Sequence, residues 1–129
     1  MANIVGIDLG TTFSSLAMLN AIGKPEIIPN ADGERLTPSA IFFDEENPDV
    51  IRVGVEALNS RYLNPSRSVR WVKRHMGTDY KVNIDGKDWS PVELSSLILR
   101  KLRQDCSVER GEIRDAVISV PAHFDEVRR

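Results

Sequence analysis

Short apolar runs separated by polar turns fill most of the chain and predict a series of β-strands. The first run, Ile4–Ile7, is rich in β-branched residues and suits a strand that is covered on both faces. A polar turn follows, and Ser15–Leu19 continues as a second strand, so the two are expected to form a hairpin. Further strands are predicted at Pro25–Pro29, Ala40–Phe43 and Val50–Val53, and Asp85-Gly86 predicts a hairpin of Tyr80–Ile84 with Lys87–Trp89.

Apolar residues recur at helical spacing in three later segments. Val55–Tyr62 predicts a first helix and Ser68–Met76 a second, in which Lys73 lies on the apolar arc. The third helix has the clearest start, because Ser90 and Glu93 have the spacing of a capping box. Its buried stripe is expected to consist of Leu94, Leu97, Ile98 and Leu102.

A last apolar run, Ala116–Val120, predicts a strand of the fully buried kind that Pro121 ends. A helical pattern begins after it and has barely started where the 129 residues stop, so the sequence indicates a piece of a longer polypeptide. Strands and helices mix along the chain without a repeat. We therefore predict an α/β fold with a mixed sheet and packed helices.

The turn of the first hairpin carries the clearest candidate chemistry. Asp8 stands where the first strand ends, and the turn runs from Gly10 through Thr11 and Thr12 to Phe13. Backbone amides and hydroxyls of such a turn can bind phosphate oxygens, and the carboxylate can hold a hydrated cation. The glycine spacing fits neither common nucleotide loop, so phosphate would lie on a β-hairpin. An ordinary hairpin turn can contain the same residues, and the motif alone leaves both interpretations open.

Composition narrows the class of protein further. The 129 residues with 41% hydrophobic content allow one modest core. A net charge of -2 gives no general attraction to nucleic acid or to an anionic membrane, so neither is expected as a partner. The single cysteine, Cys106, cannot form an internal disulfide, and no apolar run approaches membrane-spanning length. A cytoplasmic protein is the expectation.

Five segments that span nearly the whole chain carry a family resemblance. The segments are Gly6–Ser14, Leu36–Ser39, Val53–Ala57, Val72–Gly77 and Val117–Phe124. Together, and in this order, they resemble the DnaK-type, seventy-kilodalton heat-shock chaperones of the actin-like ATPase superfamily. The resemblance implies the amino-terminal part of an actin-like, ribonuclease H-like ATPase domain.

The resemblance also implies roles for residues of the hairpin. Asp8 matches the acidic residue that contacts the hydration shell of Mg²⁺, and Gly10 with Thr11, Thr12 and Phe13 matches the loop around the β- and γ-phosphates of ATP or ADP. These roles agree with the chemistry of the turn itself.

Three residues outside the hairpin also match residues with roles in the family. Lys73 matches the family's catalytic lysine, which points at the γ-phosphate and the attacking water. From periodicity alone, a lysine whose long stem crosses an apolar surface is the competing interpretation. Pro121 resembles the proline that relays the nucleotide state, and Arg129 the arginine that works with it in coupling to the substrate domain.

For the whole protein, the resemblance implies an ATP-hydrolysing chaperone in which the nucleotide state controls the binding of unfolded polypeptides. J-domain and nucleotide-exchange cochaperones are the implied partners. The remaining phosphate loop and the peptide-binding domain would lie beyond Arg129, so we expect the 129 residues alone to lack appreciable ATPase activity. A small-molecule kinase or a filament protein of the same superfamily could share the hairpin, and a divergent relative could bind ATP without hydrolysing it.

The resemblance also divides residues 1–129, as lobe I of the nucleotide-binding domain, into two parts. An inner subdomain would comprise 1–38 and 113–129, and a smaller inserted outer subdomain would comprise 39–112, in which the stretch from Gly77 to Ser90 is shorter than is usual for the family. His123 and Asp125 stand where the family usually has tyrosine and asparagine. An inner sheet that is incomplete in isolation also makes a dimer or a domain exchange a reasonable hypothesis.

Overall fold

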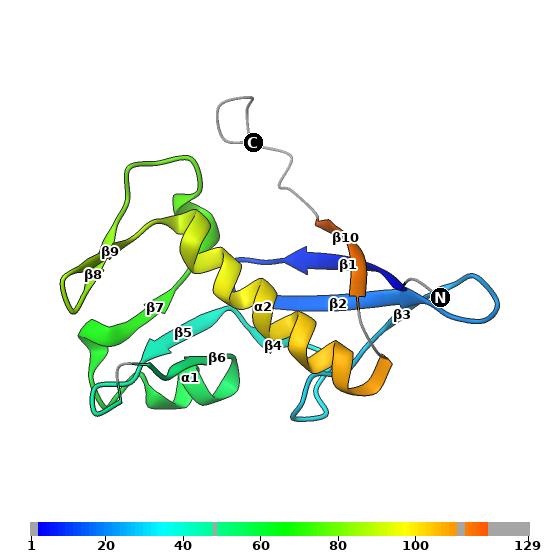
Figure 1. Ribbon diagram of the computed structural model, residues 1–129, viewed down its shortest axis with the longest axis horizontal. Helices are drawn as coiled ribbons and strands as arrows, with labels where there is room; N and C mark the ends of the chain where they lie inside the picture. The colour runs from blue at the N-terminus through cyan, green and yellow to red at the C-terminus, as the bar shows by residue number, and fades with distance from the viewer. Residues whose placement is uncertain (1–2, 48, 111–112, 119–129) are drawn as a thin grey trace.

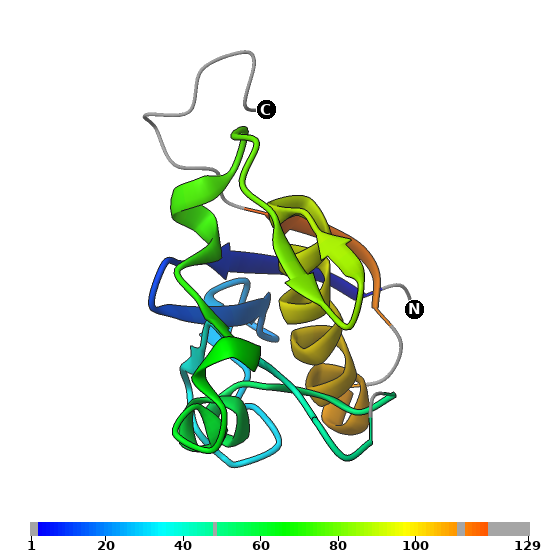
Figure 2. The same ribbon diagram turned by 90° about the vertical axis from the view of Figure 1, so that its left-hand side faces the viewer.

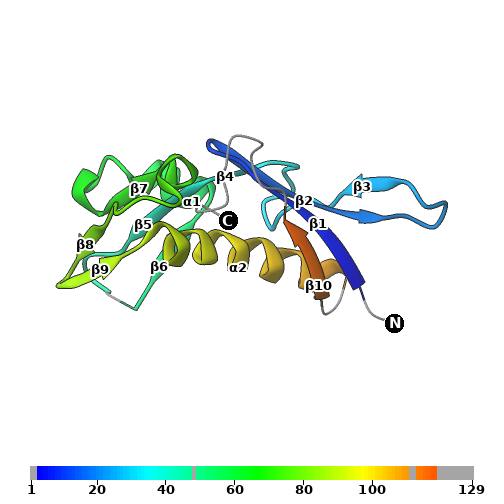
Figure 3. The same ribbon diagram turned by 90° about the horizontal axis from the view of Figure 1, so that it is seen from above.

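Two β-sheets lie along one long helix, α2 (Pro91–Arg110), which packs against both of them (Figures 1 and 3). The computed structural model describes residues 3–47, 49–110 and 113–118. Pro121, Arg129 and the predicted turn of helix near the end of the chain lie outside these described residues. The α/β fold with a mixed sheet is confirmed.

The first sheet contains the hairpin at the start of the chain. Its strand order is β10-β1-β2-β3, with β4 paired to β2. β1 and β2 are antiparallel, whereas β1 and β10 are parallel. The strands are β1 (Asn3–Leu9), β2 (Phe13–Leu19), β3 (Pro25–Ile27), β4 (Thr37–Pro38) and β10 (Ile113–Ile118).

The second sheet has the order β6-β5-β7, and both neighbours of β5 are antiparallel to it. A separate hairpin of β8 and β9 precedes the beginning of α2 (Figure 2). The strands are β5 (Ala40–Phe43), β6 (Ile51–Val53), β7 (Ser68–Arg70), β8 (Val82–Ile84) and β9 (Lys87–Trp89). The helical segments are α1 (Val55–Ser60) and the two short 3₁₀ helices η1 (Pro65–Arg67) and η2 (Val72–His75).

Local sequence chemistry explains two of these elements directly. The turn between β8 and β9 places Asp85 at φ 52° and Gly86 at φ 86°, the left-handed pair that a two-residue hairpin requires. At the start of α2, the amide of Glu93 donates to Ser90 Oγ at 3.2 Å and the amide of Ser90 donates to Glu93 Oε1 at 3.0 Å. The predicted hairpin and capping box are therefore confirmed.

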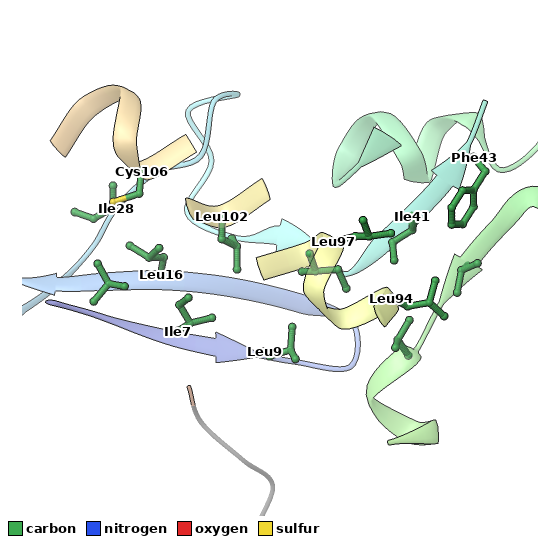
Figure 4. Close-up of a cluster of buried hydrophobic side chains, with 14 of the residues drawn as sticks. Ile7, Leu9, Leu16, Ile28, Ile41, Phe43, Leu94, Leu97, Leu102 and Cys106 are labelled. Atoms are coloured by element: carbon green, nitrogen blue, oxygen red, sulfur yellow. The ribbon is translucent and has the colours of Figure 1, made fainter. Parts of the chain in front are cut away.

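One continuous apolar core joins the two sheets through α2. Leu94, Leu97, Ile98 and Leu102 are all buried, as the helical spacing predicts. In Figure 4, Cys106 and Ile28 mark one end of this cluster and Phe43 marks the other. The helix thereby fixes the first sheet, with its hairpin, relative to the second.

The helix predicted over Ser68–Met76 is wrong. Residues 68–70 form β7, whose Val69 pairs with Ile41 of β5, and the chain continues as the 3₁₀ helix η2. Val69 and Val72 are buried in the structure, as they would be in the predicted helix. A spacing of three residues therefore does not distinguish a helix from a strand that is followed by a tight turn. Pairing with β5, which is distant in sequence, decides the outcome.

Two strands are less covered than their apolar sequences predict. In β1, Val5 and Ile7 are buried but Ile4 is 61% exposed, because α2 packs against only one face of the sheet. Val117 in β10 pairs with Gly6 and is 69% exposed on the same open face. Among the described residues, nothing covers this face, so the expectation of two-sided burial is wrong for both strands.

Candidate functional site

The turn between β1 and β2 is the candidate phosphate-binding loop, and its backbone requires glycine. β1 ends at Leu9 and β2 begins at Phe13, which leaves Gly10, Thr11 and Thr12 as the turn. A β-carbon added at Gly10 would collide with the carbonyl oxygen of Phe13. The turn is therefore closed more tightly than any other residue at position 10 would permit, as a loop that presents backbone to a ligand requires.

Two hydrogen bonds from Ser39 stabilise this turn. Its amide donates to the carbonyl of Thr12 at 2.8 Å, and its hydroxyl donates to the carbonyl of Gly10 at 2.9 Å. The hydroxyls of Ser39 and Ser14 lie 2.8 Å apart, and both residues are almost completely buried. Because the one hydroxyl hydrogen of Ser39 is used on Gly10, Ser14 must be the donor in the bond between the two serines.

The side chains around the turn are accessible to a ligand. Asp8 is exposed at the end of β1, opposite Ser15, and Thr12 is exposed in the turn itself. Thr11 is half-buried, and Phe13 is 46% exposed. The structure thus presents a carboxylate and two hydroxyls next to the backbone turn, and such groups can contact a hydrated magnesium ion and phosphate oxygens.

A small cavity of about 100 Å³ connects this turn to the end of β7. Its lining includes Thr11, Thr12 and Phe13 on one side and Arg70 and Trp71 on the other. Neither Asp8 nor Lys73 lines this cavity. The structure therefore brings the predicted phosphate loop together with the residues that directly precede η2.

Lys73 lies in η2, two residues after Trp71. Its neighbour Val72 is buried, whereas Lys73 itself is half-buried. Among the described residues, the structure gives its ammonium group no ion pair. The α-helix on which the expectation for Lys73 was based does not form, because Val72–His75 is a 3₁₀ helix.

Arg67 fixes the segment in which β7 begins. Its Nε donates to the carbonyl of Phe43 at 2.7 Å, and its other two nitrogens form a two-point ion pair with Asp85 at 2.8 Å each. These hydrogen bonds from the guanidinium lower the pKa of Asp85 below its ordinary value. The pair ties β5, β7 and the turn of the β8–β9 hairpin to one another.

Sequence reasoning gave no role in the site to four residues that build it: Ser14, Ser39, Arg70 and Trp71. No local pattern marks the two serines, because their contact joins positions 25 residues apart. Arg70 and Trp71 were visible only as part of a predicted helix. In the structure these two residues are in contact with each other, and Trp71 also contacts a third, since the guanidinium carbons of Arg70 and Arg74 lie 4.2 and 5.5 Å from the centre of the Trp71 ring.

The described residues contain neither a cluster of metal ligands nor a membrane-spanning helix. No three His, Cys, Asp or Glu side chains gather there in a way that would hold a metal ion. None of the helices there has the length and apolar character needed to cross a membrane. A magnesium ion that is held mainly by nucleotide phosphates and water needs only one or two protein carboxylates, so Asp8 fits such an ion without a cluster of ligands.

Comparison with known proteins gives a family match over nearly the whole chain. Residues 4–85 and 78–129 match the sequence model of the family described as "Hsp70 protein". The chain is 47% identical over 127 residues to proteins named "Chaperone protein DnaK" from Thermotoga neapolitana, Thermotoga petrophila and Thermotoga maritima. Each alignment covers 98% of this chain and 21% of the relative, so the chain spans about a fifth of their length.

Proposed function

This chain belongs to the Hsp70 family, and we propose that its first hairpin binds the phosphates of ATP and ADP within a chaperone ATPase. The observation that carries this proposal is the Gly10 turn, which is closed too tightly for a side chain at that position and whose carbonyl accepts a hydrogen bond from Ser39. An ordinary surface turn needs neither feature. Family membership favours the chaperone over the small-molecule kinase or filament protein that the hairpin alone left open.

Each residue of the site has a proposed task. Thr11, Thr12 and Phe13 would surround the β- and γ-phosphates with backbone amides and hydroxyls. Asp8 would accept hydrogen bonds from water in the hydration shell of Mg²⁺. Mg²⁺ bound together with ATP would neutralise negative charge on the phosphate oxygens.

Lys73 is the proposed catalytic residue. Phosphoryl transfer to water depends mostly on positioning and on stabilisation of charge that develops on the phosphate oxygens. Lys73 is half-buried and has no ion pair to the described residues, so its ammonium group can interact with that charge. Its long side chain gives it the reach to do so from η2.

At the level of the whole protein, we propose that the nucleotide state controls the binding of unfolded polypeptides and that J-domain and nucleotide-exchange cochaperones act on this cycle in the cytoplasm. The proposed architecture is ribonuclease H-like, with an inner subdomain of 1–38 and 113–129 and an outer subdomain of 39–112. Pro121 and Arg129 keep their proposed coupling roles, as residues outside the described ranges. Family membership supports these proposals.

The proposed function is tested by replacing Lys73 in the complete gene product. Lys73→Met keeps most of the side-chain volume and removes the charge, and Lys81→Met makes the same change at an exposed position. We expect Lys73→Met to slow single-turnover ATP hydrolysis by about a hundredfold to a thousandfold, as loss of one preorganised charge-stabilising group does. ATP affinity, measured by calorimetry, should change much less, and Lys81→Met should behave as the unchanged protein.

Two outcomes would refute the proposed function. If the gene product does not bind ATP, the hairpin is not a nucleotide site. If it binds ATP and Lys73→Met hydrolyses it at the rate of the unchanged protein, Lys73 does not act on the phosphate.

A further inference from the structure

Trp71 adopts a backbone conformation that its side chain disfavours. Its φ and ψ are 59° and 34°, in the left-handed region, where bulky residues are rare. Among the described residues, the other non-glycine residue with positive φ is Asp85, which occupies a two-residue hairpin turn. No hairpin turn accounts for Trp71, so the surrounding structure must impose this conformation.

The neighbours of Trp71 explain why the chain changes from a strand to a 3₁₀ helix there. Arg70 is paired with Ala40 at the end of β7, and Val72, 2% exposed, is buried in the core. The carbonyl of Trp71 accepts the amide of Arg74 at 3.1 Å, which starts η2. A left-handed residue between Arg70 and Val72 is what turns the end of the strand into this short helix.

Burial does not account for the indole ring. Trp71 is 39% exposed, so a smaller residue would serve a purely space-filling role with less exposed apolar surface. Its ring instead contacts two guanidinium groups, those of Arg70 before it and Arg74 after it, at distances typical of cation–π pairs. These contacts hold the ring to both ends of the segment that contains Lys73.

Trp71 also lies next to the proposed phosphate loop. It lines the same small cavity as Thr11, Thr12 and Phe13. The backbone connects the two sides as well, because Ser39 holds the loop and its neighbour Ala40 pairs with Arg70. Trp71 therefore lies between the loop and the 3₁₀ helix that carries Lys73.

We propose that Trp71 is a positioning residue for Lys73. Its left-handed backbone sets the direction in which η2 leaves β7, and its ring, held by Arg70 and Arg74, keeps that helix at a fixed place relative to the phosphate loop. This inference rests on the proposed function, because it assigns a task that matters only if Lys73 acts on bound ATP.

The test uses the complete gene product and three substitutions of Trp71. Trp71→Phe keeps an aromatic ring, Trp71→Gly keeps easy access to the left-handed backbone without a ring, and Trp71→Ala removes the ring and keeps the backbone strain. Trp89→Phe is the control, because Trp89 lies in β9 and packs against Phe43. Thermal melting establishes that each variant is folded.

We expect Trp71→Ala to slow single-turnover hydrolysis by about tenfold to a hundredfold, since a catalytic group displaced by about 1 Å can lose about a hundredfold in rate. ATP affinity should stay within about threefold, because the loop that binds phosphate is unchanged. Trp71→Phe should hydrolyse ATP at nearly the rate of the unchanged protein. The rate of Trp71→Gly should lie between the rates of Trp71→Phe and Trp71→Ala, and Trp89→Phe should not slow hydrolysis. A structural role without positioning would not produce this separation of rate from affinity or its rescue by Phe.

The double variant Trp71→Ala/Lys73→Met separates the two hypotheses. If Trp71 acts through Lys73, the double variant hydrolyses ATP no more slowly than Lys73→Met alone. A further loss in the double variant, or a normal rate in both Trp71→Ala and Trp71→Gly while Lys73→Met is slow, would overturn the role of Trp71 and leave the proposed function intact. If Trp71→Ala does not fold, Trp71→Gly, which relieves the backbone strain, replaces it in the same comparison.

Discussion

The hydrogen bonds of Ser39 make the proposed phosphate loop sensitive to a very small change. Ser39→Ala removes one oxygen atom from a site that is 3% exposed. Two bonds disappear with it, the one to the carbonyl of Gly10 and the one from the hydroxyl of Ser14. The bond from the amide of residue 39 to the carbonyl of Thr12 remains, because it belongs to the backbone.

The expected free energies follow from these contacts. At about 1 kcal/mol for each net hydrogen bond, Ser39→Ala should lower the free energy of unfolding by about 2 kcal/mol and Ser14→Ala by about 1 kcal/mol. The bond between the two serines is lost in both single variants. Ser14→Ala/Ser39→Ala should therefore cost about 2 kcal/mol, with a coupling energy of about 1 kcal/mol between the sites.

Urea unfolding of the 129-residue chain, followed by the fluorescence of its two tryptophans, measures all four proteins of this cycle. Ser107→Ala is the matched control, because within the described part of the chain this residue is exposed and its hydroxyl donates to the carbonyl of Gln104 in its own helix. The control should stay within about 0.5 kcal/mol of the unchanged chain. A similarly small effect of Ser39→Ala, or single effects that add without coupling, would refute the assignment of this network.

Two further substitutions test the loop and the ion pair. Gly10→Ala should destabilise the chain by about 1–3 kcal/mol, because the new β-carbon collides with the carbonyl of Phe13, whereas Gly6→Ala, with open space around its β-carbon, should be neutral or slightly stabilising in the same urea assay. Because Arg67 lowers the pKa of Asp85 below 3.8, their pair stabilises the fold fully above that pH and loses its effect as the pH falls through the lowered pKa. Asp85→Asn removes the charge and keeps a residue suited to φ 52°. Near neutral pH this variant should therefore melt at a lower temperature than the unchanged chain, and the difference should disappear in acid. A difference in melting temperature that does not depend on pH would contradict the pairing.

Elements with strong local chemistry could be predicted from the sequence. The start of α2 depends on Ser90 and Glu93, three positions apart, and the β8–β9 turn depends on Asp85 and Gly86 alone. In both cases the residues that determine the structure are also those that form its hydrogen bonds or adopt its special dihedral angles. The hairpin of β1 and β2 was predictable for the same reason.

Features that depend on contacts between distant positions could not be predicted in this way. Residues 68–70 are a strand because β5 offers them a partner, and apolar spacing does not reveal that pairing. Exposure of Ile4 and Val117 likewise depends on what lies on the second face of the sheet. An apolar sequence shows that a strand can be buried on both faces, and packing decides how many faces are covered.

The candidate site contains both predictable local features and contacts that the sequence does not reveal. Asp8 and the Gly10 turn were predictable because they are local, but Ser39, which distinguishes a braced loop from an ordinary turn, contacts Gly10 across 29 positions. Lys73 was identified by resemblance and by its place among apolar residues, and that place is nearly the same in a helix and in a strand followed by a 3₁₀ turn. What the helical description could not contain is the left-handed Trp71, since an α-helix has no such residue in its interior. The residue proposed to position Lys73 is therefore the one at which the sequence-based prediction was wrong, and substitutions at Trp71 test that proposal most directly.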